Sequence, residues 1–314
     1  MMSALYLTVL DSLIFVSFAA TFQSATTASL THLGGGFLGA AALNACTHAV
    51  LPVVFKRLYY KDTGREDLNK RYNRFHEMIN TLVQMIFFVY FEVVIFRSNS
   101  WLWWSDTTTA WTSDPVPSNL RMFYGVNLGT WLTAAVTCRF YEERNKDWLL
   151  MYTHHTASII LVAGSYAIGQ ERFGIMVLFL HHISDIVLNC CQATHYLGWD
   201  AESFPFGIPV AEVLFVCNIC CWAYTRLYIF PFTIVRSVTF EIAGIEGEKY
   251  ARMLSVFLYL LQGMHIWWFS EMIRVVVKIL TPGVSAKEAA SVYLTEREEE
   301  AAKKKKTKED KKKM

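Results

Sequence analysis

Four histidines and one aspartate stand close together in the middle of the chain, inside stretches that are otherwise apolar. The first stretch carries the adjacent pair His154 and His155, and the next carries His181, His182 and Asp185. A carboxylate beside an imidazole fixes its tautomer and stabilises its protonated form, which is what a general base requires. These residue types therefore favour acid–base catalysis in an apolar environment.

The spacing of these residues predicts how their side chains are directed. On a helix, His181 and His182 lie four and three positions before Asp185, so the three share a broad face. His154 and His155 point about 100° apart, so we expect one to face the reaction centre and the other to bond to a neighbouring helix. A single histidine in an apolar helix is more often such a helix–helix contact, but a cluster on two neighbouring helices favours a functional site.

A metal site is the competing interpretation, because histidine and aspartate are also good metal ligands. Membrane di-iron hydroxylases carry their histidines in HxxxH and HxxHH boxes, and the remaining histidines of this chain form no such box. They are His32, His48, His76, His195 and His265. We therefore expect no metal, whereas iron or zinc in the purified protein would favour a lipid hydroxylase.

Membrane-spanning helices must position this cluster. Of the 314 residues, 54% are hydrophobic and 15% aromatic, which is typical of a membrane protein. A span needs about twenty predominantly apolar residues. Eight stretches qualify: 4–22, 34–55, 77–96, 122–139, 148–168, 173–197, 208–230 and 254–279. The sequence predicts an all-α, polytopic membrane protein, a bundle of 7–8 transmembrane helices, in which the first span is the weakest because it contains Asp11.

The distribution of charge predicts the orientation. The segments 56–76 and 139–147 are basic, whereas 97–121 is rich in tryptophan, so the two basic segments and the C-terminus are expected to be cytosolic. The tail 284–314 is a charge run that we expect to be disordered. Its Lys311 and Lys312 match a dilysine retrieval signal, which predicts the endoplasmic reticulum membrane. No feature indicates a nucleic-acid partner.

Other polar residues within the spans have simpler interpretations. The seven cysteines fall in or beside apolar stretches, which favours free thiols over disulfides. Arg226 is expected near one end of its span, where its side chain can reach the interface. Glu271 and Arg274 are spaced to pair with each other. Glu92 and Glu212 can face the bundle interior and have no assigned role.

The run from Lys146 to Asn189 resembles the longevity-assurance motif of the ceramide synthases, a branch of the TLC-domain family. The matching positions are His154, His155, Ser165, Tyr166, Arg172, Gly174, His181, Ser184 and Asp185. The segments 222–232 and 261–278 also resemble helices of that family, and the resemblance extends from about Leu68 to Thr281. It implies an N-terminal membrane region at 1–67, a TLC domain with a six-helix core at 68–283 and a cytosolic tail at 284–314.

The resemblance also implies an activity, the N-acylation of a long-chain sphingoid base by a fatty acyl-CoA. His154 or His155 is then the general base or a nucleophile that forms an acyl-imidazole, Asp185 orients that imidazole, and His181 and His182 complete a polar cage. Four residues are expected to bind substrate: Arg144, Lys146, Tyr166 and Asn189. Acyl-CoA is a co-substrate, no further cofactor is expected, and the partners are membrane lipid, acyl-CoA and sphingoid base.

One departure from the family pattern affects the expected site. The family usually has aspartate where this chain has His182, so only Asp185 remains of an acidic pair. The alternative function is accordingly a non-enzymatic TLC-domain protein for lipid sensing, lipid transport or translocation, because one fold hosts both kinds of protein. The sequence leaves open the acyl-chain length, the preferred sphingoid base and whether the protein is a homo- or hetero-oligomer.

Overall fold

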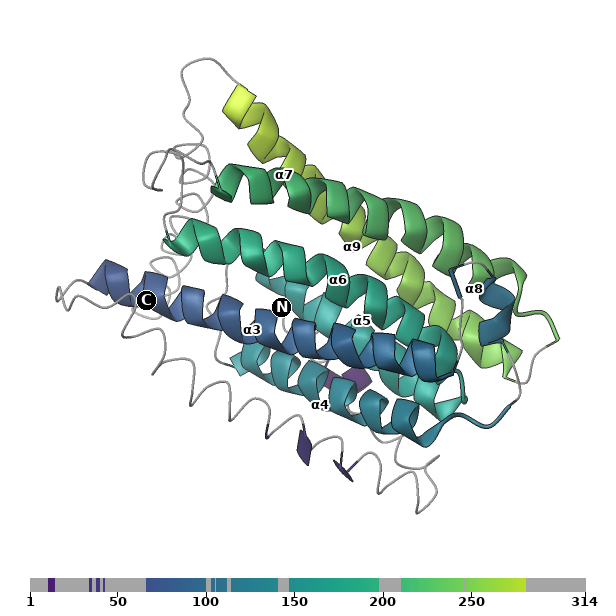
Figure 1. Ribbon diagram of the computed structural model, residues 1–314. Helices are drawn as coiled ribbons and strands as arrows, with labels where there is room; N and C mark the ends of the chain where they lie inside the picture. Colours follow the sequence, from purple (N-terminus) through teal and green to yellow (C-terminus); the bar gives the residue numbers. More distant parts are fainter. Residues whose placement is uncertain are drawn as a thin grey trace, which may run out of the picture.

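The structure is a computed structural model that describes most of the chain from 66 to 280. The described residues are 11–14, 34–35, 38–39, 42, 66–99, 103–104, 106–111, 114–140, 147–197, 210–244 and 247–280. Within them every regular element is helical (Figure 1), which confirms the all-α prediction. The first two expected spans and the charged tail lie largely or wholly outside the described residues.

Six long helical elements form the described bundle. They are α3 (Glu66–Ser98), α4 (Ser118–Phe140), α5 (Trp148–Ala167), α6 (Glu171–Leu197), the continuous series α7 (Val210–Trp222), η3 (Ala223–Val235) and α8 (Arg236–Phe240), and α9 (Glu248–Leu280). A short 3-10 helix, η1 (Thr107–Ala110), lies between α3 and α4.

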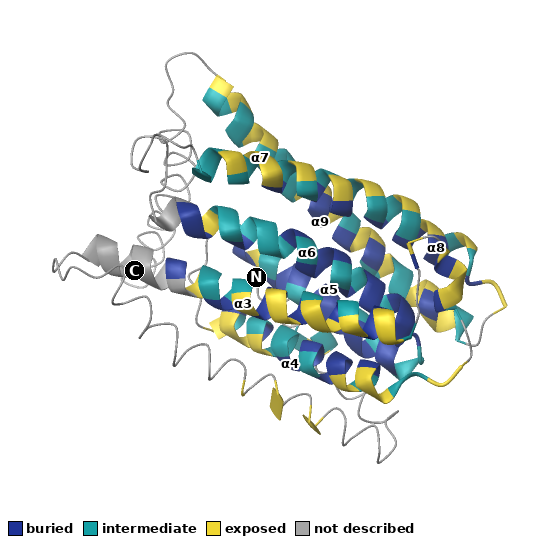
Figure 2. Cartoon of the chain, in the orientation of Figure 1, coloured by how far each residue is buried: buried dark blue, intermediate teal, exposed yellow. Residues whose placement is uncertain are grey.

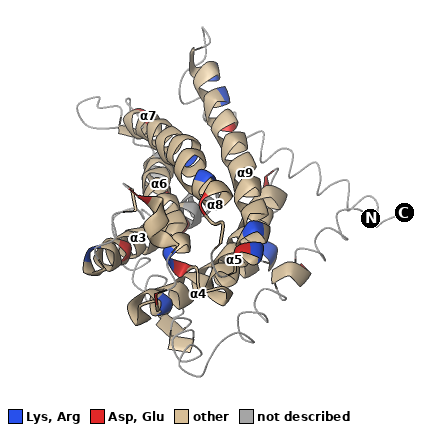
Figure 3. Ribbon diagram, turned by 90° about the vertical axis from the view of Figure 1, so that its right-hand side faces the viewer, with Lys and Arg blue, Asp and Glu red and all other residues tan. Residues whose placement is uncertain are grey.

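The six elements are arranged as a ring. The order around it is α3, α6, α7 with η3, α9, α5 and α4, and α4 returns to α3. Figure 3, turned by 90° from Figure 1, shows this arrangement and the small number of charged residues among the helices. The two helices that carry the histidine cluster, α5 and α6, also contact each other directly across the inside of the ring.

The distribution of polar residues is that of a membrane protein. Large apolar side chains such as Phe232, 65% exposed, and Ile86, 51% exposed, face outward, whereas Arg226 and Glu92 are buried. Figure 2 shows these exposed outer faces around a buried interior. Lipid can solvate the outer apolar side chains, and the buried polar groups need partners inside the bundle.

Three stretches are long and apolar enough to cross a membrane, as the sequence predicts. They are Glu77–Ser98, Glu171–Thr194 and Val210–Phe240. The helices α4, α5 and α9 contain 23, 20 and 33 residues, which is sufficient length for a span. Their interiors contain more polar residues, so their membrane crossing stays a prediction that rests on their place in the ring.

The series α7–η3–α8 corrects the predicted span 208–230. The helix continues to Phe240 through Pro231, and η3 is a π-helix. Proline removes a backbone donor and normally ends a helix, but the wider π turn accommodates it and such turns are frequent at functional sites. Arg226 therefore lies in the middle of the span, and its expected place near a membrane interface is wrong.

The connection between α3 and α4 closes one end of the ring. Trp111 stacks on Phe173 of α6 with ring centroids 4.4 Å apart, and its indole nitrogen donates to the hydroxyl of Ser237 in α8 at 2.8 Å. Asp106 begins η1 by accepting hydrogen bonds from the side chain and backbone of Thr108, and these bonds lower the pKa of its carboxyl. This segment forms a cap over the end of the bundle where α5 turns into α6.

A piece of the first expected span contacts the other end of the ring. Asp11 accepts a hydrogen bond from the hydroxyl of Tyr152 in α5 and pairs with Arg139 of α4 at 3.4 Å. The carboxylate that makes this span unusually polar therefore has two partners on the bundle.

Candidate functional site

His154 and His181 bring the two halves of the predicted cluster together. The ring of His154 on α5 lies 6.4 Å from that of His181 on α6, with the planes nearly parallel, and 5.3 Å from Trp268 of α9. His154 Nδ1 is buried and has no hydrogen-bond partner among the described residues. This nitrogen is therefore available to a bound substrate.

His155 has a different environment, as the 100° rotation predicts. Its ring centroid lies 5.8 Å from that of Trp131 and 5.7 Å from that of His154. The ring contact with His181 is made by His154 instead. Trp131 also contacts His154, at 5.6 Å. Of the two adjacent histidines, His154 is thus the one directed at the cluster on α6.

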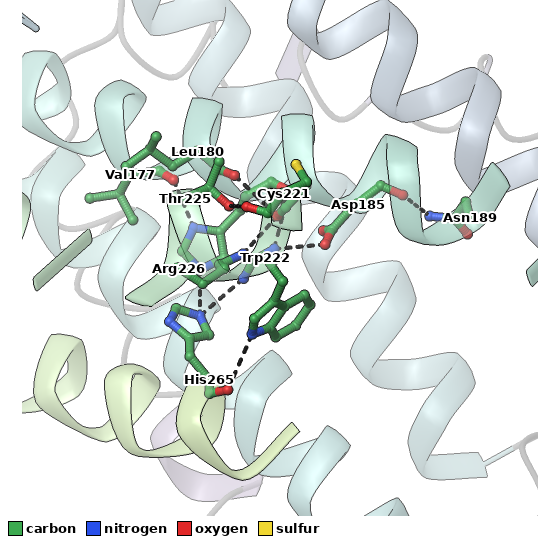
Figure 4. A network of polar contacts seen from close by, with 11 residues as sticks. Val177, Leu180, Asp185, Asn189, Cys221, Trp222, Thr225, Arg226 and His265 are labelled. Atoms are coloured by element: carbon green, nitrogen blue, oxygen red, sulfur yellow. Dashed lines mark hydrogen bonds and ion pairs between the residues drawn. The ribbon is translucent and has the colours of Figure 1, made fainter. Parts of the chain in front are cut away.

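Arg226 is the centre of the polar network (Figure 4), although the sequence did not predict it as a site residue. It is 1% exposed. Its Nε donates to Ser184 Oγ at 2.7 Å, its Nη1 contacts His265 Nε2 at 3.0 Å, and its Nη2 donates to the carbonyl oxygen of His181 at 3.1 Å and to Asp185 Oδ1 at 2.6 Å. The guanidinium therefore joins α6, η3 and α9.

The role expected for Asp185 is corrected by this network. Among the described residues its carboxylate pairs with Arg226 rather than with an imidazole of the adjacent pair. A buried arginine needs a compensating charge, and Asp185 on the facing helix supplies it. Asp185 consequently orients the histidines indirectly, through Arg226.

His181 and His265 form a pair that lacks one hydrogen. His181 Nδ1 lies 2.7 Å from the carbonyl oxygen of Val177 and must donate to it, while His265 Nε2 accepts from Arg226. The two Nε2 atoms are 3.2 Å apart, so in the neutral rings two lone pairs face each other. The bonds from Arg226 to His265 and from His181 to Val177 therefore hold the two rings in place.

His182 does not join this cage, which is a second correction. Its Nδ1 lies 2.8 Å from Glu92 Oε1 on α3, and both side chains are fully buried. The ring of Phe88 packs against it at a centroid distance of 4.9 Å. Because adjacent helix positions point about 100° apart, His181 faces the inside of the ring while His182 faces α3.

Two of the four expected substrate-binding residues, Tyr166 and Asn189, lie among the described residues. Tyr166 lies twelve positions after His154, about 18 Å along the helix axis, and packs beside Arg121. The side-chain amide of Asn189 donates to the backbone oxygen of Asp185 within the same helix. Arg144 and Lys146 lie outside the described residues. Substrate binding by these four stays a prediction.

An apolar cavity begins at the cluster. His181 and Trp131 line it at one end, and Trp111 and Phe173 line it where the cap closes the ring. Between them the wall is mainly aliphatic and is formed by α5, α6, α8 and α9. Its members include Leu161, Val162, Ile168, Val177, Leu178, Val238, Leu254, Leu258 and Leu261. This apolar lining suits a hydrocarbon chain, and His181 is a polar group at one end of it.

A close approach of two helices shapes one wall of this cavity. A Cβ atom added to Gly174 of α6 would lie 1.5 Å from the hydroxyl oxygen of Tyr124 on α4. The same hydroxyl lies 3.3 Å from Ser165 Oγ on α5. Glycine is thus required at position 174 for α4, α5 and α6 to meet there.

The residues that the sequence missed share one weak signal, an ionisable group at mid-span. Glu92, Arg226 and His265 all lie inside apolar segments, and buried charge in a membrane is expensive. Their partners stand on other helices, so no local spacing identifies the pairs. Within the described residues, no group of three histidine, cysteine, aspartate or glutamate side chains has an arrangement that could hold a metal ion.

The smaller predictions on cysteines and on α9 agree with the structure. The six cysteines among the described residues are free thiols, and Glu271 pairs with Arg274 as their spacing predicts.

Comparison with known proteins gives a consistent result. A family model described as a TLC domain matches residues 74–274, well over half of the chain. This range begins within α3 and ends within α9, and it includes His154, His181, Arg226 and His265.

Individual relatives carry a common name. A protein named ceramide synthase 1 LOH3 from Arabidopsis thaliana is 29% identical over 191 residues, which cover 58% of this chain and 59% of the relative. Ceramide synthase 5 from Homo sapiens is 29% identical over 199 residues, or 62% of this chain and 48% of the relative. Ceramide synthase hyl-1 from Caenorhabditis elegans is 27% identical, over 64% of this chain and 56% of the relative. The chain thus matches about half to three fifths of the length of these three relatives.

Proposed function

The chain belongs to the TLC domain family, and we propose that it is a ceramide synthase, which transfers a fatty acyl group from acyl-CoA to the amine of a long-chain sphingoid base. The observation that carries the proposal is an apolar cavity inside a membrane protein, with His181 lining one end and the ring of His154 next to that of His181 at a centroid distance of 6.4 Å. The names of the relatives support it, because similar chains are called ceramide synthases.

The cavity suits the acyl chain of the thioester. Its aliphatic wall suits hydrocarbon, and Trp131, which lines the same end as His181, contacts the ring of His154. In this proposal the thioester carbon lies at that end, beside His154. The sphingoid base, a membrane lipid, then approaches that carbon with its amine. Burial of the chain holds the two reactants in one geometry, which is a large part of the catalysis available to a transferase.

His154 performs the central step in this proposal. It takes a proton from the amine as a general base, or its free nitrogen attacks the thioester carbon and forms an acyl-imidazole that the amine then cleaves. In both routes the C–S bond breaks, the C–N bond of the amide forms, and the thiol of CoA receives one proton.

Arg226 is a positioning residue for this reaction. Its four contacts occupy the guanidinium and fix His181, Ser184 and His265 relative to one another. Because the planar fork of an arginine binds several acceptors at fixed angles, the network is rigid. It also keeps a positive charge beside the atoms where negative charge develops on the thioester oxygen.

The location and the CoA contacts complete the proposal. We infer an endoplasmic reticulum membrane protein with a cytosolic C-terminus, because the basic segments and the dilysine of the tail suit that orientation. Arg144 and Lys146 then lie on the side from which acyl-CoA arrives and bind its phosphates. No cofactor other than the acyl-CoA co-substrate is part of the proposed reaction.

The test is an assay of the purified full chain in lipid nanodiscs with sphinganine and a panel of acyl-CoAs of different chain length. We expect an amide product, detected by mass, with at least one acyl-CoA, and free CoA in equal amount. If no acyl-CoA yields amide while the protein binds sphinganine, the chain is a non-enzymatic lipid-binding member of the family. Bound iron with a hydroxylated lipid product would instead support the hydroxylase interpretation.

A further inference from the structure

A row of polar residues lies on the face of α3 that packs against α6. Asn80, Gln84 and Glu92 are separated by four and eight positions, so they lie on one face of the helix. They are 8%, 6% and 0% exposed. The other faces of α3 carry exposed apolar side chains such as Tyr90 and Val94, as expected toward lipid.

The facing side of α6 is also polar. His182 and Asn189 are two turns apart and share one face, and both are buried. His182 bonds to Glu92 at 2.8 Å, and α3 and α6 form the most extensive helix–helix contact of the bundle. We call this strip between the two helices the α3–α6 seam, made of Asn80, Gln84, Glu92, His182 and Asn189.

Three atoms of the α3–α6 seam lack hydrogen-bond partners among the described residues. They are Asn80 Oδ1, Glu92 Oε2 and His182 Nε2. A buried polar atom without a partner costs roughly 1–3 kcal/mol, and in native proteins such atoms are almost always satisfied by protein or by ordered water. Three such atoms along one strip are suited to ordered water molecules as partners.

The proposed acyl transfer creates a need for such a path. An alkylamine is an ammonium ion at neutral pH. When the nitrogen forms the amide, it loses two protons, of which one goes to the thiol of CoA and the other must leave the bundle. The reaction centre lies between the helices of the ring, so polar groups among those helices can carry this second proton to water.

We propose that the α3–α6 seam carries this proton from the reaction centre to the end of the bundle where α3 begins. His182, next to His181 in the chain, accepts it at Nε2 and passes the proton on Nδ1 to Glu92. Water then relays it past Gln84 to Asn80, about 18 Å along α3. Glu92 thus supplies from α3 the carboxylate that the family motif usually has at position 182, and ionisable groups in membrane spans commonly form such relays.

This inference rests on the proposed function, and a double variant tests it with little risk to folding. Asn80→Leu with Gln84→Leu replaces two buried amides by aliphatic side chains of similar size and removes their polar groups from the seam. We expect the kcat of amide formation to fall at least about tenfold with an unchanged KM for acyl-CoA, and imidazole, a small permeant base, to restore part of it. Glu212→Gln, which alters an intramembrane glutamate on α7 outside the seam, should retain wild-type kcat.

A second measurement needs no acyl transfer and separates the inference from the proposed function. The difference between the infrared spectra of the wild-type and Glu92→Gln proteins identifies the band of the Glu92 carboxyl. The rate at which this band shifts after transfer of the protein into D₂O measures how readily water reaches Glu92. We expect the Leu double variant to slow this response at least about tenfold. If the Leu double variant shows an unchanged D₂O response and a wild-type kcat, the proposed proton path is wrong. If the wild-type protein is inactive but the double variant shows a slowed D₂O response, only the ceramide synthase proposal is rejected.

Discussion

Arg226 makes four contacts that no other side chain can reproduce from its position on η3. A lysine would keep the charge, but its three donors radiate from one nitrogen on a flexible stem, so it cannot reproduce the fixed, spread geometry with which the guanidinium binds Asp185, Ser184 and His265. We predict that Arg226→Lys lowers acyl transfer about 100-fold, the loss expected from a misplacement of about 1 Å in an oriented site. The measurement is kcat on protein quantified in the same nanodiscs.

Arg274→Lys is the matched control for this substitution. Arg274 is exposed and pairs with Glu271 on α9, and exposed pairs contribute little. Equal activities of the Arg226→Lys and Arg274→Lys proteins would show that the network of Arg226 has no part in the site.

The residues of the site were predictable only where one segment contains them. His154 and His181 stand in a recognisable motif, and the rotation between His154 and His155 follows from helix geometry. The pairs Asp185–Arg226, His181–His265 and His182–Glu92 join residues that are 41, 84 and 90 positions apart. Such pairs depend on which helices become neighbours, so the partners expected for Asp185 and His182 were wrong.

At the scale of the helices, Gly174 is the position where three elements meet most closely. We predict that Gly174→Ala destabilises the protein by about 1–3 kcal/mol, because the added methyl group would collide with the Tyr124 hydroxyl on α4. The measurement is the unfolding midpoint in a fixed detergent.

Gly263→Ala provides the comparison for this prediction. A Cβ at position 263 of α9 meets no atom within 4 Å, and alanine is the better helix former. We expect the Gly263→Ala protein to be as stable as the wild type or slightly more so. A Gly174→Ala protein of equal stability would contradict the close approach of α4, α5 and α6.

Helix positions were predicted well where apolar runs have clear ends. The predicted spans 148–168 and 173–197 correspond to α5 at Trp148–Ala167 and α6 at Glu171–Leu197. The charged first turns of α3 and the continuation of η3 past Pro231 were not predicted. Hydropathy ends a span at charge or proline, whereas the structure continues both helices past these positions.

At the scale of the whole molecule, the cap closes the cavity opposite the histidines. Trp111 stacks on Phe173 at that end, so the distance from His181 to Trp111 limits the length of a bound acyl chain. We predict that Trp111→Ala shifts the preferred acyl-CoA in the panel assay to a chain longer by at least two carbons. The kcat/KM for the longer acyl-CoA relative to the original one should rise about tenfold, because a missing contact of this size contributes about one to three kcal/mol.

Trp104→Ala tests whether this shift belongs to the cavity. Trp104 lies in the same connection but is 61% exposed, and it does not line the cavity. We expect it to leave the chain-length preference unchanged. If Trp111→Ala also leaves the preference unchanged, the acyl chain does not reach the cap.

The most direct test of the account compares amide formation by wild-type, His154→Ala and His195→Ala proteins, with sphinganine and the best acyl-CoA at equal protein concentration. His195 lies near the end of α6, outside the cluster, and serves as the matched histidine. The account predicts ceramide from the wild-type and His195→Ala proteins and a loss of about 100-fold or more for His154→Ala. Equal rates for all three proteins would contradict a catalytic role for His154 beside the His181 end of the cavity.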